Sequence, residues 1–279
     1  MHGTLGLRIL RVSRVVADLD RAEAFYRDGL GFRAAGRGPG DPETPELLGV
    51  PGATTSEVVM RLGAQEIALV RVAPEGPPYP AGSRSNDLWF QHLAIVVSDM
   101  GAAYRMLVRQ RPRPISSDGP QTLPPRNGRV TAFKFRDPDG HPLELIRFPS
   151  GQGRPVWRQP GGPFLGIDHS ALSVAATAPS LRFYRRLGFR VADRSFNYGL
   201  PQSRLDGLPG ARVHVTGIRP AASDSMGLEL LCYSPPGRPA AIMPGNARVT
   251  DWTTLLIPGL RQREMQRDPD GHLMLLTPP

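Results

Sequence analysis

The sequence predicts an α+β fold made of four tandem βαβββ modules, the fourth truncated, arranged as two similar halves. Two signatures occur twice: the helix end at 24–32 returns at 182–189, and the segment DPDGH at 137–141 returns identically at 268–272. The 279 residues also include 31 glycines and 31 prolines, which favour short strands over long helices. We therefore expect curved, mostly antiparallel sheets with the helices outside.

The elements of each module follow from hydrophobic periodicity and capping residues. Asp18 and Asp99 precede apolar helical patterns as N-caps, and Gly31 ends the first pattern. In the first half this predicts strands at 7–16, 56–62, 65–72, 91–97, 129–136 and 142–148, with helices at 19–30 and 100–110. In the second half it predicts strands at 167–174, 211–218, 227–233, 248–257 and 272–277, with one helix at 178–187.

The fourth module is expected to lack its helix. Its DPDGH signature follows its first strand too closely to leave room for a helix and a strand between them. The predicted N-terminal domain is 1–148, with modules at 7–72 and 87–148. A linker at 149–165 leads to a C-terminal domain at 166–279, with modules at 166–236 and 247–279.

The composition excludes several classes of protein. Hydrophobic residues make up 40% and charged residues 21%, an ordinary globular mixture, and no apolar run approaches the ~18 residues of a membrane span. No signal-peptide pattern is present and Cys232 is the only cysteine, so we expect a cytoplasmic protein without disulfides. We expect a monomer or a homodimer.

The formal net charge of +9 does not predict nucleic-acid binding. Lys134 is the only lysine, and the arginines are scattered rather than clustered. Such a preference for arginine is typical of a GC-rich genome, and we expect a bacterial source. The positive balance favours an anionic small molecule as the substrate.

The ordered combination of motifs resembles the vicinal oxygen chelate superfamily, which includes glyoxalase I, extradiol dioxygenases and bleomycin-resistance proteins. The matching pieces are VADLDR at 16–21, Phe25-Tyr26, Gly31-Phe32 and DPDGHPLEL at 137–145. The resemblance extends over nearly the whole chain. It implies paired modules that enclose a concave trough, with metal ligands on the first and last strand of a module.

Carried over one position at a time, the resemblance places ligands only in modules two and three. The second module supplies His92 and Glu144, and the third supplies His169 and Glu229. The corresponding positions in modules one and four are not ligands: Arg11, Ala68, Trp252 and Leu275. Both glutamates lie inside apolar strands, where an unpaired carboxylate costs several kcal/mol, so a metal ion or an arginine partner is needed.

Two pairings of the modules are known in the family that this chain resembles. If modules two and three face one trough, as in tandem glyoxalases, the four residues form one site. If module one pairs with two and three with four, as in extradiol dioxygenases, each half holds only two ligands. Two imidazoles and two carboxylates suit Zn²⁺, Ni²⁺, Fe²⁺, Mn²⁺ or Co²⁺. His141 and His272 follow tight turns and are expected to be exposed.

Three functions follow from this reading. The first is a metal-dependent lyase or isomerase of glyoxalase type, in which a metal-bound enediolate forms on a small oxygenated substrate and Glu144 or Glu229 acts as the base. The second is an extradiol-type dioxygenase with two histidines and one carboxylate on Fe²⁺. The third is a metal-free binding protein of the bleomycin-resistance kind. Metal content and oxygen consumption distinguish the three.

Overall fold

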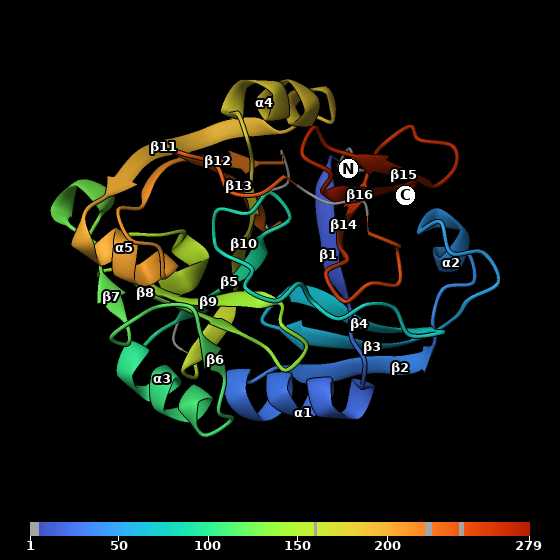
Figure 1. Ribbon diagram of the computed structural model, residues 1–279, viewed down its shortest axis with the longest axis horizontal. Coiled ribbons are helices and arrows are strands. Elements are labelled where there is room, and N and C mark those ends of the chain that lie inside the picture. The colour runs from blue at the N-terminus through green and yellow to red at the C-terminus, as the bar shows by residue number, and fades with distance from the viewer. Residues whose placement is uncertain (1–5, 159–160, 221–224, 240–242) are drawn as a thin grey trace, which may run out of the picture.

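The structure is a computed structural model that describes residues 6–158, 161–220, 225–239 and 243–279, and it consists of short helices and many strands (Figure 1). Up to the second linker the elements are β1 (Arg8–Val15), α1 (Leu19–Leu30), β2 (Arg33–Pro39), α2 (Thr44–Leu47), β3 (Thr54–Leu62), β4 (Gln65–Ala73), β5 (Gln91–Val97), α3 (Met100–Val108), β6 (Arg113–Pro114), β7 (Gln121–Thr122), the 3₁₀ turn η1 (Pro125–Asn127), β8 (Thr131–Arg136) and β9 (Pro142–Arg147). The rest are a second 3₁₀ turn, η2 (Pro155–Arg158), then β10 (Phe164–Ser173), α4 (Thr177–Arg186), β11 (Arg190–Tyr198), α5 (Leu200–Asp206), β12 (Arg212–Arg219), β13 (Gly227–Tyr233), β14 (Asp251–Leu256), β15 (Glu264–Arg267) and β16 (Leu273–Thr277).

The strands form two mixed sheets, and each sheet takes strands from both halves of the sequence. The seven-stranded sheet has the order β15-β16-β14-β1-β4-β3-β2, and the nine-stranded sheet has the order β11-β12-β13-β10-β5-β9-β8-β6, with β7 on β8. The predicted modules two and three therefore share one sheet, as do modules one and four. This topology confirms the pairing of two with three and contradicts the pairing of one with two. The division into domains at 149–165 stays a prediction.

Four strand pairs are parallel: β1 with β4, β5 with β9, β10 with β13, and β14 with β16. The other pairs are antiparallel, including the central contact between β5 and β10. Each parallel pair joins the first and last strand of a predicted module. Side chains that lie far apart in the sequence consequently become neighbours on one face of a sheet.

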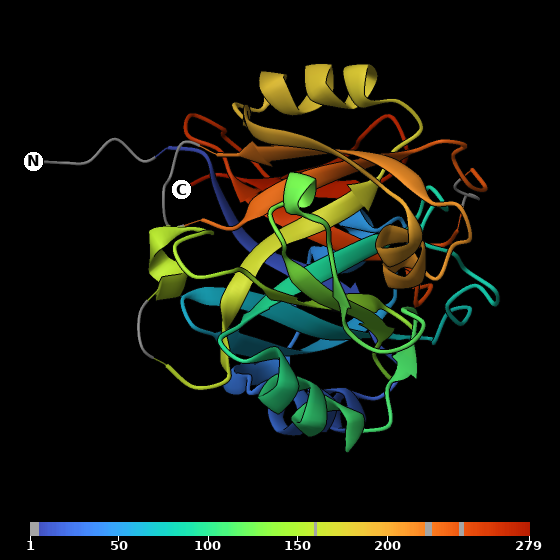
Figure 2. The ribbon, with the colours of Figure 1, turned by 90° about the vertical axis from the view of Figure 1, so that its left-hand side faces the viewer.

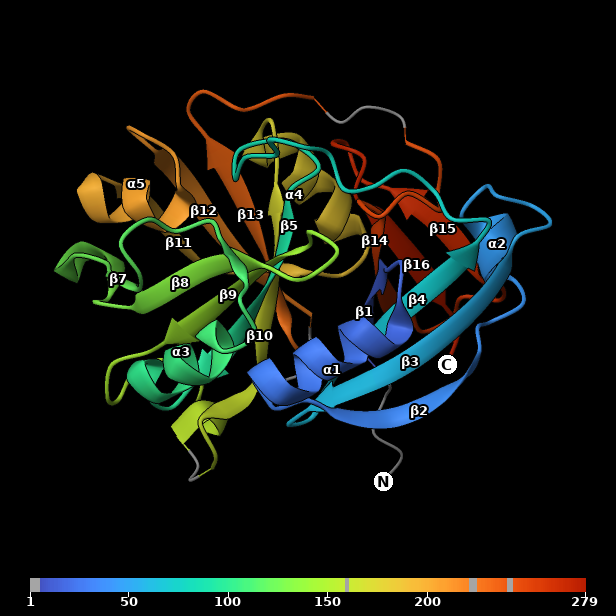
Figure 3. The ribbon, with the colours of Figure 1, turned by 60° about the horizontal axis from the view of Figure 1, so that its bottom comes forward.

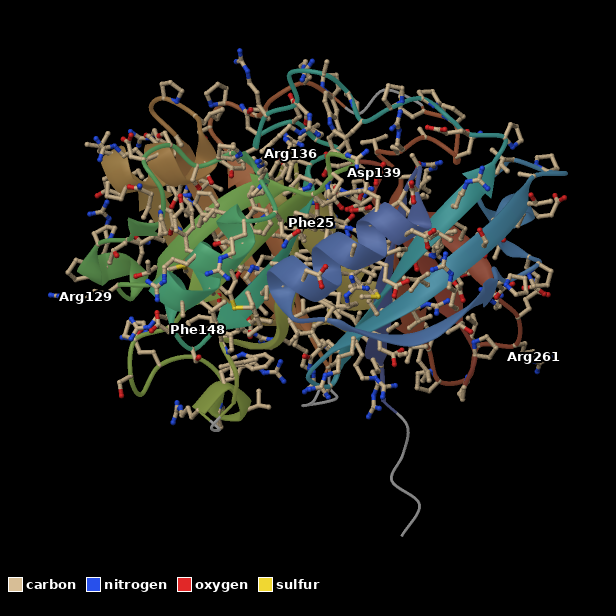
Figure 4. The ribbon with its side chains drawn as sticks, turned by 90° about the horizontal axis from the view of Figure 1, so that it is seen from below. Phe25, Arg129, Arg136, Asp139, Phe148 and Arg261 are labelled. Carbon is tan, nitrogen blue, oxygen red and sulfur yellow. The ribbon has the colours of Figure 1, made fainter. Side chains whose placement is uncertain are left out.

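The long helices lie outside the sheets, as predicted. Figure 2 shows α4 on one side of the strands and both α1 and α3 on the opposite side. Asp18 caps α1 by accepting hydrogen bonds from the backbone N–H groups of residues 20 and 21, and Gly31 ends it in the left-handed conformation with φ 71°. Phe25 of α1 (labelled in Figure 4), Leu107 of α3 and Tyr184 of α4 are buried in one apolar core with strand residues of both sheets.

The sequence does not predict several of the smaller or more exposed elements, including β6, β7 and the two 3₁₀ turns. β2 and most of β11 carry exposed side chains, so neither shows the alternation of a half-buried strand. The short helices α2 and α5 and the strand β15 were also not predicted. The predicted fourth module, residues 247–279, contains no helix, and β15 precedes the DPDGH turn.

The expectation that His141 and His272 are exposed is wrong. Their relative exposures are 0% and 7%. Each turn packs against the end of the first strand of another module: His141 Nε2 donates to the carbonyl oxygen of Val15 at 2.8 Å, and His272 Nε2 donates to that of Ser173 at 2.9 Å. A tight turn predicts exposure only where no other element covers it, and here a strand end does.

Candidate metal centre in the nine-stranded sheet

The two candidate histidines lie on the two central strands of the nine-stranded sheet, β5 and β10, which run side by side in Figure 3. In the antiparallel register His169 is opposite Ala94, and Ala171 is opposite His92. Each imidazole therefore faces a small side chain across the strand pair. The two rings fit into the trough together, with centroids 5.9 Å apart and planes inclined by 68°.

The candidate glutamates come from the next strands outward. Glu144 on β9 is opposite Ala94, and Glu229 on β13 is opposite Ala171. Each alanine thus lies between an imidazole from one module and a carboxylate from the other. The alternation of side chains along a strand puts both carboxylates on the same face as the histidines.

The structure brings three of the four predicted residues into one cluster. Ligand atoms of His92, Glu144 and His169 all lie within 4.8 Å of one another. His92 Nε2 is 2.7 Å from Glu144 Oε2. Glu229 is outside this group, but its Oε2 is 3.4 Å from His169 Nε2, and its side chain is 26% exposed, against 8% for Glu144.

The donor set fits a divalent cation. His92 Nδ1 and His169 Nε2 are buried and have no hydrogen-bond partner among the described residues. His92 Nε2 faces the Glu144 carboxylate at 2.7 Å. Leaving buried polar atoms unsatisfied costs about 1–3 kcal/mol each. Two imidazoles and carboxylates around a common point are the ligands that borderline divalent metals prefer.

Lys134 is a charged residue of the site that the sequence reasoning missed. It lies directly opposite Glu144 in the β8–β9 ladder, is buried, and its Nζ is 2.7 Å from Asp206 Oδ1. Burial acts to raise the pKa of Glu144, but Lys134 and His92 outweigh it and lower that pKa to about 2. The usable signal was the only lysine of the chain inside the apolar run AFKF at 132–135.

The two histidines have opposite electrostatic surroundings. Burial and the nearby Lys134 lower the pKa of His92 to about 4, so at neutral pH its ring is uncharged, the form that binds metals. Burial also acts to lower the pKa of His169, but Glu229 and Asp168 outweigh it and raise that pKa to about 9. Burial raises the pKa of Glu229, and its neighbour Asp193 adds to the increase.

The four residues line a cavity of about 610 Å³ in the trough of the nine-stranded sheet. Apolar side chains of β12 and β13 form one wall, and others from β9 and its flanks form the opposite wall, which includes Phe148 (labelled in Figure 4). Arg126, Asn127 and Gln152 are among the polar groups that line it. The cavity can hold a small molecule with a polar centre between two apolar walls.

The corresponding positions in the seven-stranded sheet form no such site. Ala68, Trp252 and Leu275 belong to a buried apolar cluster, against which Leu47 of α2 also packs. Arg11 forms an ion pair with Glu57 at 3.5 Å. Among the described residues, the cluster of potential ligands in the nine-stranded sheet is the only one of its kind.

His214 is also not part of the cavity. Its ring stacks on Phe196 with centroids 4.3 Å apart, and the neighbouring Val213 and Val215 line the cavity instead. Because strand residues alternate, His214 faces the other side of the sheet.

None of the helices in the described residues is long and apolar enough to span a membrane.

The chain has two mixed sheets built from repeated strand–helix–strand units, and histidines and carboxylates gather in the trough of one sheet. These features place it in a class of trough-forming α+β proteins. Residues 8–145 match the family model of the Glyoxalase/Bleomycin resistance protein/Dioxygenase superfamily, and this part of the chain belongs to that superfamily. A comparison with curated proteins gives no match.

Solved structures extend the likeness over nearly the whole chain. Glyoxalase I from Zea mays is 17% identical, with 97% of this chain and 92% of that one covered and a TM-score of 0.62. A point mutant of the same enzyme is 18% identical with a TM-score of 0.64, over 97% of this chain and 92% of its own. A candidate dioxygenase from Bacillus subtilis subsp. subtilis str. 168 is 12% identical, with 99% and 86% covered and a TM-score of 0.58. At these identities the likeness shows a shared fold.

Proposed function

We propose that this chain is a divalent-metal-dependent enzyme of the glyoxalase-like lyase or isomerase type, acting on a small oxygenated substrate. The observation that supports this most is the cluster of His92, Glu144 and His169 within 4.8 Å, beside Glu229 in a cavity of about 610 Å³. These four residues would hold Zn²⁺, Ni²⁺, Fe²⁺, Mn²⁺ or Co²⁺. Such an ion, when bound, polarises a carbonyl oxygen as a Lewis acid.

The two carboxylates have different surroundings, which suggests different roles. Glu144 is almost fully buried and lies opposite the Lys134 ammonium group, an arrangement that suits a permanent ligand. Glu229 is more exposed to the cavity and lies outside the three-residue cluster. We therefore assign Glu229 as the first candidate for the base that moves a proton on the carbon beside the carbonyl, with Glu144 as the second.

The remaining groups of the cavity would bind and orient the substrate. The two apolar walls would pack against its carbon skeleton and exclude water from the reacting carbon. The polar side chains at Arg126, Asn127 and Gln152 would contact its oxygen atoms or an anionic group.

A cytoplasmic location and a monomeric or homodimeric state stay predictions.

A second candidate function is an extradiol-type ring-cleaving dioxygenase. The specific observation in its favour is that the three clustered residues are two histidines and one carboxylate, the set used by non-haem Fe²⁺ oxygenases. In this reading Glu229 is not a ligand. Oxygen uptake on addition of catechol to the Fe²⁺-loaded protein would move the assignment to this branch.

Metal analysis tests the proposed function. The native protein, stripped with a chelator and reloaded, should bind about one equivalent of a divalent metal, and His169→Ala should lose most of it. His214→Ala is the matched control, because His214 faces the other side of the sheet, and its metal content should stay at the native value. A native protein that binds no divalent metal would contradict the proposal and favour a metal-free binding protein.

The reaction type is tested with the loaded protein and a thiol adduct of an α-ketoaldehyde. Isomerisation should exchange the proton beside the carbonyl with solvent deuterium, without oxygen uptake.

A further inference from the structure

Asp168 lies on the same side of β10 as its neighbour His169, although adjacent strand residues normally face opposite sides. The β10–β5 register shifts between Ile167 and His169, which places Asp168 in an irregularity of the β-bulge type. Its Oδ2 is 3.1 Å from His169 Nδ1. The irregularity thus turns a carboxylate onto the rear of a candidate ligand.

Two further donors fix the carboxylate of Asp168. Trp157 of η2 donates from Nε1 to Oδ1 at 2.8 Å, and Arg219 of β12 donates from Nη2 to Oδ2 at 3.2 Å. Asp168 itself is only 4% exposed. An ionised carboxylate can only accept hydrogen bonds, so the Nδ1 of His169 must be the donor in the contact between them.

The opposite ring nitrogen faces the candidate metal centre. His169 Nε2 lies 3.4 Å from Glu229 Oε2 and makes no hydrogen bond with the described residues. With the Nδ1 proton held by Asp168, Nε2 is the atom left to act as a ligand.

His92 offers a comparison within the same site. The residue before it is Gln91, which lies in regular register in β5, and its side-chain amide donates to Ser170 Oγ at 3.0 Å. The Nδ1 of His92 is buried without a hydrogen-bond partner among the described residues. The two imidazoles are therefore held differently, and only His169 has a carboxylate behind it.

We propose that Asp168 is a positioning residue that fixes the Nδ1–H form of His169 and makes His169 the better-oriented of the two histidine ligands. The proposal rests on the proposed function, because it assigns His169 to a metal centre. Trp157 of η2, within the predicted linker, extends this arrangement by its hydrogen bond to Asp168.

The test compares Asp168→Asn with Gln91→Ala in the full-length protein. Zn²⁺ affinity is measured by competition with a chelating dye. Removing a carboxylate behind a ligating histidine typically costs 10–100-fold in metal affinity, and we expect that loss in Asp168→Asn. We expect less than a threefold change in Gln91→Ala, since the side-chain amide of Gln91 donates to Ser170 Oγ and supplies no carboxylate behind His92. An Asp168→Asn affinity within threefold of native would overturn the proposal.

A second readout does not depend on activity or on metal affinity. Long-range ¹H–¹⁵N NMR of the native protein, with and without Zn²⁺, should show a downfield proton on His169 Nδ1 that moves upfield or disappears in Asp168→Asn. If that variant does not fold, the native spectrum alone decides: a His169 without a proton on Nδ1 overturns the proposal. Absence of Zn²⁺ binding by the native protein would instead overturn the proposed function.

Discussion

Tyr26 of α1 donates its buried hydroxyl hydrogen to Asp137 Oδ2 at 3.0 Å. This contact joins the helix of module one to the DPDGH turn of module two. The second half repeats the contact: Tyr184 of α4 donates to Asp268 Oδ2 at 2.9 Å. The two signatures that recur in the sequence are therefore direct partners in space. The backbone N–H of Ala17 also donates to Asp139, labelled in Figure 4, at 3.1 Å.

Replacing either tyrosine by phenylalanine should destabilise the fold. Tyr184→Phe removes the hydroxyl donor to Asp268 Oδ2, and a buried polar group left unsatisfied costs about 1–3 kcal/mol. Tyr26→Phe should cost more, because Arg14 Nη1 also donates to the Tyr26 hydroxyl at 3.1 Å. The free energy of unfolding in urea measures both. Tyr198→Phe, in an exposed residue, is the control and should change stability little; an equal effect in all three would contradict the prediction.

The pair of Lys134 and Asp206 should attach α5 to β8. Lys134→Met leaves the Asp206 carboxylate, whose side chain is 0% exposed, without its cation. Breaking a buried ion pair in this way typically costs about 3–5 kcal/mol. The exposed pair of Arg27 and Asp28 is the control, with side chains 54% and 48% exposed, and Arg27→Met should change stability little. Urea unfolding measures both, and similar costs would show that the buried pair does not anchor α5.

His141 should make stability depend on pH above neutrality. Burial lowers its pKa, but Asp251, whose Oδ1 is 2.9 Å from His141 Nδ1, outweighs burial, so the pKa in the folded protein is raised. The stabilisation is therefore fully present below the unfolded pKa of about 6.5 and is lost as pH rises through the higher folded pKa. The stability advantage of the native protein over His141→Gln should be largest near pH 6 and shrink toward pH 9. An advantage that stays constant across this pH range would contradict the assignment.

The parts of the fold that follow from sequence are those in which burial is periodic. Phe25 and Tyr26 lie on the predicted buried face of α1, and Gly31 ends that helix as expected. β2 was missed because its exposed side chains leave no alternation to detect. The burial of His141 was missed because the turn motif does not reveal which element covers it.

The residues of the candidate site also differ in whether the sequence could predict them. The positions of His92 and Glu144 follow from the resemblance to the superfamily, and the sheet topology brings them next to His169. Asp168 was missed because regular alternation assigns it to the opposite face, and only the register shift before His169 reverses this. Lys134 was missed because the motif register considers only the first and last strands of a module, whereas Lys134 lies on β8, which pairs with the outer side of β9.

The glutamates give the last prediction, which separates a base from a ligand. Glu144→Gln and Glu229→Gln each remove a carboxylate and keep its size. If Glu229 is the base, Glu229→Gln should slow turnover by about 10²–10⁴ while most of the metal stays bound, because a positioned general base is worth that much in rate. Glu144→Gln should instead lose metal and activity together, because Glu144 belongs to the tight three-residue cluster.

Each glutamate variant serves as the control for the other in one experiment. Solvent-deuterium exchange into a thiol adduct of an α-ketoaldehyde, or into an α-hydroxycarbonyl compound, reports proton transfer, and elemental analysis of the same samples reports metal occupancy. A fall in exchange at full occupancy identifies the base, whereas a fall that follows occupancy identifies a ligand. If Glu144→Gln instead loses exchange at full metal occupancy while Glu229→Gln loses metal, Glu144 is the base. The more exposed Glu229 then only completes the coordination. Full exchange in both variants at full metal occupancy would show that neither carboxylate is the base.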